Sequence, residues 1–261
     1  MRPGISLDIY GRDGQILLDA GRGPIRSTVI FKRFFLHNPG KGTKATRIAI
    51  GWRRLQKMKQ GGLITYFPNY RLSDMVVVLR PKGAIPVCEY FGLGHEKIWT
   101  HVPSEKSCLH DTYVGDSLRK FFDDEKAGKF VIDNYFFEDE LRRVMVDPFR
   151  PKKGVGYPDL VIILLYSSGQ SKAYHIEIDC GSVPIDSIRK KISFRSREPF
   201  LFIVNGKKRF WWLFDKLSEF APKVNYRDIY ITSAQEFFNK NFGECLWLRP
   251  PDKTAQKIEG D

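Results

Sequence analysis

Several features of membrane, secreted and zinc-binding proteins are missing from this sequence. It contains no apolar run of about 18 residues, the length that a transmembrane helix needs. Its first residues also lack the apolar stretch of a secretory signal. The four cysteines stand far apart, without a Cys-x-x-Cys pair, which argues against a zinc ribbon or a disulfide framework. We therefore expect a cytoplasmic protein with reduced, mostly buried thiols and no membrane partner.

Acidic residues are missing from one long stretch of the chain. No Asp or Glu lies between Ala20 and Ser73, although this stretch holds 12 of the 43 Lys and Arg residues. The remainder of the chain then has 31 basic residues against 30 acidic ones, so almost the whole net charge of +13 is concentrated there. A solvated charged face normally contains acids as well. A stretch that carries only positive charges therefore indicates a polyanionic partner, which we take to be DNA.

The basic stretch is predicted to form two helices. Pro24 is suited to open the first, which would extend to Phe35, and the Pro and Gly residues within 38–42 end it. Thr43 is a suitable N-cap for a second helix that reaches about Gln60. The second helix has apolar residues at spacings of three and four, which predict one buried face: Ala45, Ile48, Trp52, Leu55 and Met58.

Two strand-like segments follow the second helix, at residues 63–67 and 75–79, with a turn at Pro68-Asn69. A strand pair directly after a basic helix indicates a winged helix-turn-helix. In that motif the second helix enters the major groove and the hairpin contacts the DNA backbone. The predicted DNA-binding residues are basic and lie outside the apolar face or on the hairpin: Lys44, Arg47, Arg53, Arg54, Lys57 and Arg71.

The second half of the chain alternates strand-like and helical segments, which predicts a mixed-sheet α/β domain. Because there is no internal repeat or long linker, the sequence places the domain boundary only within a range near residues 105–130. The expected domains are residues 1–105 for DNA binding and 106–249 for the α/β domain, followed by a polar, disordered tail at 250–261. Trp211 and Trp212 lie in an aromatic-rich helix, where we expect them to fill the core.

Three carboxylates are the main candidates for chemistry. His175, Glu177 and Asp179 alternate along one strand and therefore share a face, and Asp159 begins the neighbouring strand. Asp159, Glu177 and Asp179 can together hold a hard cation such as Mg²⁺ or Mn²⁺, which would polarise a phosphodiester and activate water. His175 is better interpreted as a structural strand histidine than as a base or a ligand.

The spacing of these carboxylates resembles the PD-(D/E)XK nuclease pattern. Pro158-Asp159 is followed eighteen residues later by Glu177-Ile178-Asp179. The Lys of that pattern, two residues after the Glu, is replaced by Asp179. Lys190 and Lys191 on the following helix can supply a substitute, and we choose Lys191 as the fourth catalytic residue, where it would orient water or neutralise developing charge.

Three longer motifs extend this pattern. They are residues 177–182 with Lys191 and Phe194 beyond them, the segment 53–64, and the segment 110–119. They resemble the signature, the helix-and-wing segment and the linking helix of the replication-relaxation family, although Cys180 and Ser182 replace its usual Arg and Thr. The resemblance covers residues 23–204. It implies a winged helix, a PD-(D/E)XK nuclease-like domain, and a role in the replication or mobilisation of plasmids and mobile elements.

Two functions remain open from the sequence. The chain is either a metal-dependent DNA endonuclease, or a non-catalytic replication initiator or transcriptional regulator with a degenerate nuclease domain. Further partners are a second copy in a homodimer or other replication and mobilisation proteins. An RNA-binding module is a weaker alternative, because no RNP-like motif is present. Glu140 could add a carboxylate to the site, but a surface pair with Arg142 or Arg143 is the better interpretation.

Overall fold

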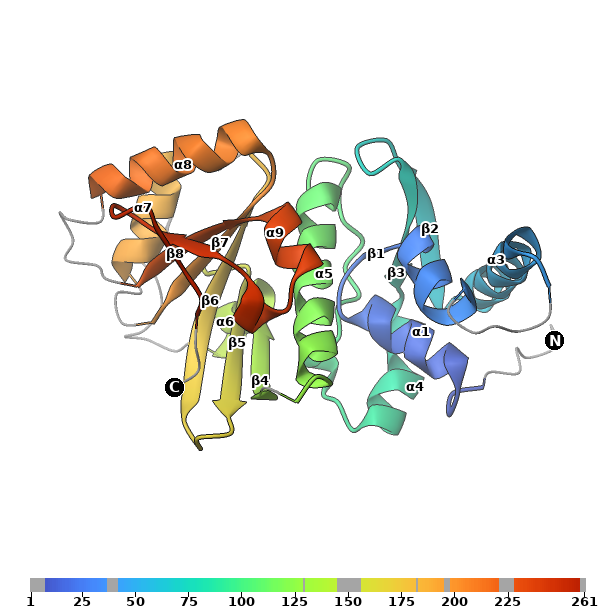
Figure 1. Ribbon diagram of the computed structural model, residues 1–261. Coiled ribbons are helices and arrows are strands. Elements are labelled where there is room, and N and C mark those ends of the chain that lie inside the picture. The colour runs from blue at the N-terminus through green and yellow to red at the C-terminus, as the bar shows by residue number, and fades with distance from the viewer. Residues whose placement is uncertain are drawn as a thin grey trace. The chain divides into compact units, whose positions relative to one another are not determined.

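The computed structural model describes residues 8–36, 42–128, 130–144, 156–181, 183–194, 198–220 and 228–258. The chain divides into two compact units, residues 1–119 and 120–261, and each is described by itself. The division falls within helix α5 (Cys108–Glu125), inside the range near residues 105–130 expected for the boundary and later than residue 105. Both units combine helices with β-sheet, so the chain has a mixed α/β fold (Figure 1).

The first unit contains a small antiparallel sheet surrounded by helices. The strands, in the spatial order β1-β3-β2, are β1 (Ile25–Arg26), β2 (Ile64–Asn69) and β3 (Asp74–Leu79). The helices are α1 (Arg12–Gly21), α2 (Ser27–Phe31) with a π-helical continuation (Lys32–Leu36), α3 (Lys44–Gln60), α4 (Pro81–Phe91) and the first part of α5.

Helix α3 begins where the sequence predicts. Thr43 has an extended backbone, and its side-chain oxygen accepts a hydrogen bond from the Thr46 N–H at 3.2 Å, so it caps the helix. The predicted apolar face is buried only in its second half. Leu55 and Met58 are fully buried, whereas Ala45 is exposed and two further members, Ile48 and Trp52, are half-buried.

The predicted strand pair is present, with its turn shifted by two residues. The pairing of β2 with β3 runs from Ile64 opposite Leu79 to Asn69 opposite Asp74, so the predicted turn residues Pro68 and Asn69 belong to β2. The turn lies at residues 70–73, where the Asn69 side-chain oxygen accepts a hydrogen bond from the Leu72 N–H at 3.1 Å. This hydrogen bond stabilises a turn that follows Asn69, whereas the Pro68-Asn69 pair predicted a turn at those two residues.

The helix expected to open at Pro24 begins later, at Ser27. Ile25 and Arg26 instead form β1 and pair with β3. Asp74 of β3 accepts hydrogen bonds from the Ser27 hydroxyl at 2.7 Å and from the Thr28 N–H at 3.3 Å, which satisfies the start of α2 from another element. A cap supplied from 47 residues away in the sequence is not visible in the local pattern.

Helix α1 was not anticipated from the sequence, yet it contributes much of the core of the first unit. Ile16, Leu17 and Ala20 are fully buried and pack in one cluster with Ile30 of α2 and Leu55 of α3. The helix therefore shields the inner side of α2 and α3, which leaves the outer side of α3 available for other contacts.

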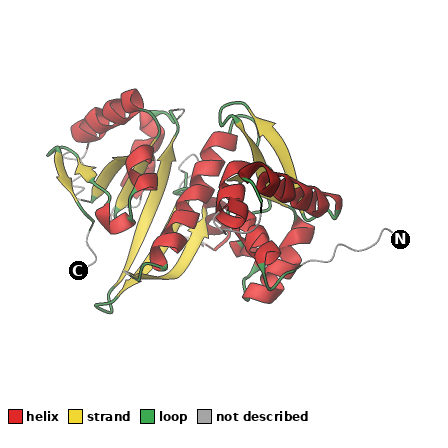
Figure 2. Ribbon diagram, turned by 45° about the vertical axis from the view of Figure 1, so that its right-hand side comes forward, coloured by secondary structure: helices red, strands yellow, loops and turns green. Residues whose placement is uncertain are grey.

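The second unit is built on a seven-stranded mixed sheet (Figure 2). The strands, in the spatial order β10-β9-β8-β7-β6-β5-β4, are β4 (Phe130–Phe137), β5 (Leu160–Tyr166), β6 (Ser171–Asp179), β7 (Phe200–Val204), β8 (Ile229–Ser233), β9 (Trp247–Arg249) and β10 (Thr254–Gln256). Strands β6, β7 and β8 are parallel, and the other neighbours are antiparallel.

Helices cover both faces of this sheet. The helices of the second unit are α6 (Glu138–Val144), α7 (Ile185–Phe194), α8 (Lys207–Phe220), α9 (Ala234–Asn239) and the end of α5. On one face, Ile188 of α7 and Leu213 of α8 pack with Phe202 of β7. On the other face, Phe121 at the end of α5 contacts Phe237 of α9.

The expected disordered tail is wrong for most of its length. Thr254 to Gln256 form β10, which pairs with β9 at the edge of the sheet, and Ile258 is buried. The edge of a sheet offers unpaired backbone groups, so even a polar segment can be ordered there through main-chain hydrogen bonds. The last residues, 259–261, lie outside the described part.

None of the helices in the described ranges combines the length and the apolar character that crossing a bilayer requires. All four cysteines are free thiols. Cys108 and Cys245 are buried, whereas Cys88 and Cys180 are half-buried.

Candidate acidic site and candidate nucleic-acid interface

Asp159 and Glu177 meet where β5 begins and β6 approaches its end. Leu160 of β5 pairs with Ile176 of β6. Asp159, which precedes Leu160, therefore lies beside Glu177, which follows Ile176. The Asp159 N–H donates to Glu177 Oε2 at 3.1 Å, and the Ile178 N–H donates to Asp159 Oδ2 at 2.8 Å. Both carboxylates are buried, and backbone donors fix their orientation.

Lys191, chosen from the sequence as the substitute for the missing motif Lys, reaches these carboxylates from α7. Its ammonium contacts Glu177 Oε1 and lies 3.9 Å from Asp159 Oδ1. Lys190 is exposed, because the adjacent position on the helix points away from Ile188 and Ile192, which are buried. The sequence alone could not decide which of the two lysines faces the carboxylates, and the structure shows that Lys191 does.

The protonation equilibria of this cluster are strongly perturbed. Burial raises the pKa of Glu177 to about 8, the nearby charge of Asp159 adds to the rise, and Lys191 opposes it. Burial lowers the pKa of Lys191, but the charges of Glu177 and Asp159 outweigh this effect and raise it above its ordinary value. Lys191 thus stays charged, and Glu177 changes its protonation state near neutral pH.

Asp179 shares the face of β6 with Glu177, as predicted, but its carboxylate is directed to other partners. It accepts hydrogen bonds from Arg209 Nε and from the Gly181 N–H, each at 2.7 Å. Arg209 also donates to the Val183 carbonyl oxygen at 2.5 Å. In the ranges that the structure describes, no group of three or more His, Cys, Asp or Glu is placed to hold a metal ion. The three-carboxylate cluster expected from the sequence is therefore not assembled.

Two secondary candidates lie near the sheet. His175 is buried with its ring edge-on to that of Phe200, at a centroid distance of 5.1 Å, which agrees with a structural role. Glu140 is buried, so the expected surface pair with Arg142 or Arg143 is wrong, and Arg142 instead contacts Glu138 one turn earlier. Glu138 is the closer partner because the i,i+4 spacing brings the two side chains together on α6.

The predicted DNA-binding residues of the first unit separate into two groups. Lys44, Arg53 and Lys57 on α3 are exposed, as is Arg71 in the turn between β2 and β3. The other two residues take part in local contacts, described next. Arg53 and Lys57, one turn apart on α3, face away from the buried Leu55, whereas Lys44 is exposed at the start of the helix on the same side as Leu55.

Arg47 and Arg54 are held by the protein itself. Arg47 donates to the carbonyl oxygens of Gly42 at 3.2 Å and Leu36 at 3.4 Å, and so ties the start of α3 to the end of the preceding helix. Arg54 Nε donates to Asp13 Oδ1 at 2.7 Å, and Asp13 is buried. The prediction that Arg54 binds DNA is therefore replaced by an ion pair with α1.

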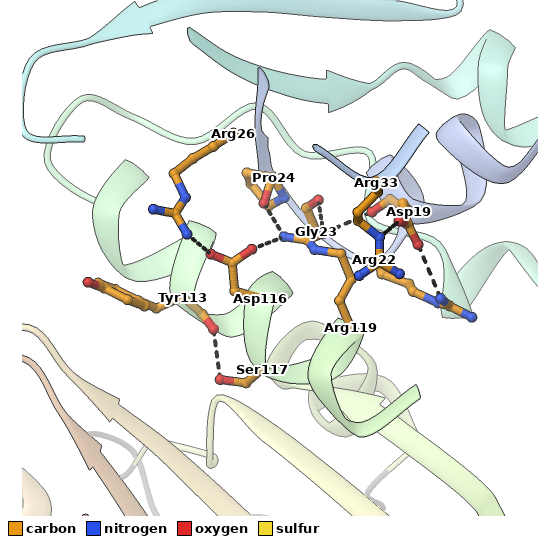
Figure 3. A network of polar contacts seen from close by, with 10 residues as sticks. All are labelled: Asp19, Arg22, Gly23, Pro24, Arg26, Arg33, Tyr113, Asp116, Ser117 and Arg119. Carbon is orange, nitrogen blue, oxygen red and sulfur yellow. Dashed lines mark hydrogen bonds and ion pairs between the residues drawn. The ribbon is translucent and has the colours of Figure 1, made fainter. Parts of the chain in front are cut away.

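Further acids from outside the basic stretch neutralise part of its charge (Figure 3). Asp19 of α1 pairs with Arg22 at 3.2 Å and with Arg33 at 2.8 Å. Asp116 of α5 lies 3.3 Å from Arg26. With Arg54, four of the twelve basic residues are thus ion-paired. Local composition could not reveal this, because the acids come from elements before and after the stretch.

A buried arginine links α5 to the segment between α1 and β1 (Figure 3). Arg119 donates to the carbonyl oxygens of Asp19 at 2.8 Å, Gly23 at 3.0 Å and Pro24 at 2.7 Å, and to Asp116 at 2.7 Å. A planar guanidinium has five N–H donors in a fixed geometry, whereas an ammonium has three, so an arginine can satisfy these four acceptors at once. The network holds the end of α1 and the residues that lead into β1 against α5.

No protein-family model matches the chain, and no curated protein is significantly similar to it. Function is therefore inferred from the residues and their geometry.

Proposed function

We propose that this chain is a DNA-binding protein of the winged helix-turn-helix type whose second unit is a PD-(D/E)XK nuclease-like domain. The observation that carries the proposal is the exposed pair Arg53 and Lys57, one turn apart on α3, in a helix that is followed by a hairpin with Arg71 in its turn. A capped basic helix followed by two paired strands fits a helix that enters the major groove beside a hairpin on the backbone.

The second unit supports the nuclease part of the proposal through its buried cluster. Asp159, just before β5, and Glu177 on β6 both face the ammonium of Lys191, and this arrangement supports a PD-(D/E)XK-like site in which the motif lysine is replaced. The substitute lysine comes from α7 instead of β6. We propose that this unit hydrolyses DNA phosphodiesters.

The proposed cofactor is Mg²⁺ or Mn²⁺. Magnesium is usually held by one or two carboxylates together with water and phosphate oxygens, so Asp159 and Glu177 fit as its protein ligands. Such an ion, when bound, supplies a Lewis acid for the phosphodiester and lowers the pKa of water. Lys191 would then orient the attacking water or neutralise developing charge. The Asp179 carboxylate is held by Arg209 at 2.7 Å, so we assign Asp179 to the positioning of Arg209 and leave it out of the proposed metal ligands.

The biological setting follows from the resemblance alone. We propose a role in plasmid or mobile-element replication or mobilisation, with DNA as the main partner and a second copy or other proteins of these processes as further partners. The exposed cations of α3 and the acidic cluster are compatible with such a role.

Duplex binding is tested with the full chain, a labelled mixed-sequence duplex and a chelator. Replacing Arg53 and Lys57 by Ala should weaken binding at least tenfold, because both side chains are exposed on the proposed groove helix. Replacing Lys253 and Lys257, two exposed lysines of the second unit, removes the same charge and should leave affinity nearly unchanged. Equal effects of the two double variants would refute the placement of the groove helix.

Cleavage is tested by incubating supercoiled and linear DNA with Mg²⁺ or Mn²⁺. Asp159→Asn and Glu177→Gln should each abolish cleavage, whereas Asp186→Asn, which changes an exposed carboxylate at the start of α7, should not. Cleavage that survives both changes in the cluster would rule out this site.

A non-catalytic role is the second candidate, and one observation favours it. Both Glu177 oxygens are engaged, by Lys191 and by the Asp159 N–H, and Asp179 is held by Arg209 and the Gly181 N–H. Such a cluster can be purely structural, in a replication initiator or transcriptional regulator that binds DNA through α3. Duplex binding without cleavage, and without Mn²⁺ binding by calorimetry, would favour this candidate.

A further inference from the structure

Helix α8 carries an exposed pair of tryptophans, contrary to the expectation that they fill the core. Trp211 is 43% exposed and Trp212 is 37% exposed. Leu213, Phe214 and Leu217 take the buried face of the helix, and the tryptophans precede them on the outer side. Two adjacent exposed aromatic side chains make this part of α8 a candidate binding surface.

The two rings are held in place by neighbouring residues. The Trp211 ring meets the rings of Phe210 and Phe214 edge-on, at centroid distances of 5.1 and 5.9 Å. The Arg209 guanidinium lies 3.9 Å from the centre of the Trp212 ring. Arg209 is itself fixed by Asp179, so the orientation of Trp212 is set by contacts that reach into β6. The pair is thus pre-organised for binding.

Cations adjoin the tryptophans at the start of α8. Lys207 and Lys208 are exposed one turn before Trp211 and Trp212, on the same side of the helix. The exposed acids of α8 follow the tryptophans on the same side, with Asp215 one turn after Trp211 and Glu219 one turn further, so the cations adjoin only the end of the patch nearest the start of the helix. Exposed aromatic rings next to exposed lysines are the combination by which proteins bind single-stranded nucleic acid, because bases stack on the rings and cations hold the phosphates.

We propose that Lys207, Lys208, Trp211 and Trp212, which we call the α8 patch, bind unpaired DNA. The choice of DNA as the occupant rests on the proposed function, whereas the patch is independent of α3. Base faces are hidden in a duplex, so the patch selects single strands. Arg209 connects Trp212 of the patch to Asp179 of β6.

The test uses the full chain, a labelled oligothymidylate that forms no duplex, and a chelator. Replacing Trp211 and Trp212 together by Leu should weaken binding of the oligonucleotide by tenfold or more, which is the scale of one lost base stack, at roughly 1–3 kcal/mol. Duplex affinity should not change. Replacing both by Phe, which keeps a ring at each position, should restore part of the affinity, and circular dichroism confirms folding.

Two double variants that remove the same positive charge distinguish binding at the α8 patch from a general attraction of DNA to the basic protein. Lys207→Ala with Lys208→Ala should weaken oligothymidylate binding several-fold, whereas Lys253→Ala with Lys257→Ala should have little effect. The proposal is overturned if the wild-type chain does not bind the oligonucleotide, if the Leu variant binds it equally well, or if the Leu changes dissociate a dimer without affecting DNA. Loss of duplex binding by the Arg53 and Lys57 variant bears only on the proposed winged helix, so the two proposals can fail separately.

Discussion

Lys191 shows how one side chain balances the charge of the acidic cluster. Its ammonium contacts Glu177 and faces Asp159, so two buried carboxylates share this cation. Above about pH 8, where Glu177 is ionised, Lys191→Ala should lower the free energy of unfolding by about 3 kcal/mol, because removal of one partner leaves buried charge uncompensated. Urea denaturation followed by fluorescence measures the change.

Lys190 is the matched control for this prediction. It is the same residue type on the same helix but is exposed, so Lys190→Ala should change the free energy of unfolding by no more than about 0.5 kcal/mol. Equal losses for the two variants would mean that the contact with Glu177 contributes nothing specific to stability.

Glu177 gives the cluster a pH dependence of definite sign. Its pKa is raised from 4.5 to about 8, first by burial and then by Asp159, so the folded chain binds this proton more tightly than the unfolded chain. The resulting stability is fully present below about pH 4.5 and is lost as pH rises towards about 8. Glu177→Gln should therefore gain stability relative to the wild type across this window. The relative gain should reach a few kcal/mol, since one pKa unit corresponds to about 1.4 kcal/mol.

Chemical denaturation at several pH values, in buffer with a chelator, measures this difference. Glu244→Gln removes an exposed carboxylate from the same unit and serves as the control. If the wild type and Glu177→Gln show parallel pH profiles between 4.5 and 8, the inferred rise in the pKa of Glu177 is wrong.

The elements predicted well from the sequence are those whose start, end and partner are determined by residues close by in the chain. Helix α3 has a capping Thr43 at its start and Gly61 at its end, and β2 and β3 are short apolar segments that pair as neighbours in the chain. Both Asp159 and Glu177 could be paired from sequence because antiparallel neighbours bring the start of one strand to the end of the other.

Other elements depend on contacts from far along the chain. The start of α2 is fixed by Asp74, and β10 is ordered by the free edge of β9, and neither signal is local. The partner of Asp179 is Arg209, thirty residues later, so the spacing of the carboxylates alone suggested a site of three. The tryptophans of α8 were misassigned because hydrophobicity was weighed without the helix phase that buries Leu213 and Leu217.

The packing of α5 against the segment before β1 requires a glycine at residue 23. Gly23 has φ +122°, and a Cβ there would lie 2.7 Å from the Cα of Gly115 on α5. Gly42 has a similar φ of +119°, but a Cβ there would meet only the Thr46 side chain at 3.4 Å. Both substitutions by Ala carry backbone strain, and Gly23→Ala adds a clash with backbone.

Gly23→Ala should therefore lower the free energy of unfolding by roughly 2 kcal/mol more than Gly42→Ala does, which is the scale of overpacking a filled site. Thermal or urea unfolding of the two variants makes the comparison. Similar losses would show that positive φ alone determines the preference for glycine, and that the approach of α5 is easily adjusted.

Across the whole molecule, the net charge of +13 overstates what the basic stretch can offer a polyanion. Asp13, Asp19 and Asp116 pair with four of its arginines, and Arg47 bonds to carbonyl oxygens. The exposed cations of α3 and the hairpin are Lys44, Arg53, Lys57, Lys59 and Arg71. The proposed interface is thus smaller and more directional than composition suggested, and its salt dependence should reflect these few exposed groups.

The logarithm of the duplex association constant should fall linearly with the logarithm of salt concentration, with a slope of about −0.9 for each phosphate contact. Arg53→Ala with Lys57→Ala should make that slope shallower by about 2, because two contacts are lost. Lys253→Ala with Lys257→Ala should leave the slope unchanged, although the net charge falls equally. Affinities measured between about 50 and 200 mM salt decide the matter. If both double variants shift the slope alike, the duplex responds to the total charge of the molecule, and α3 has no special part in binding.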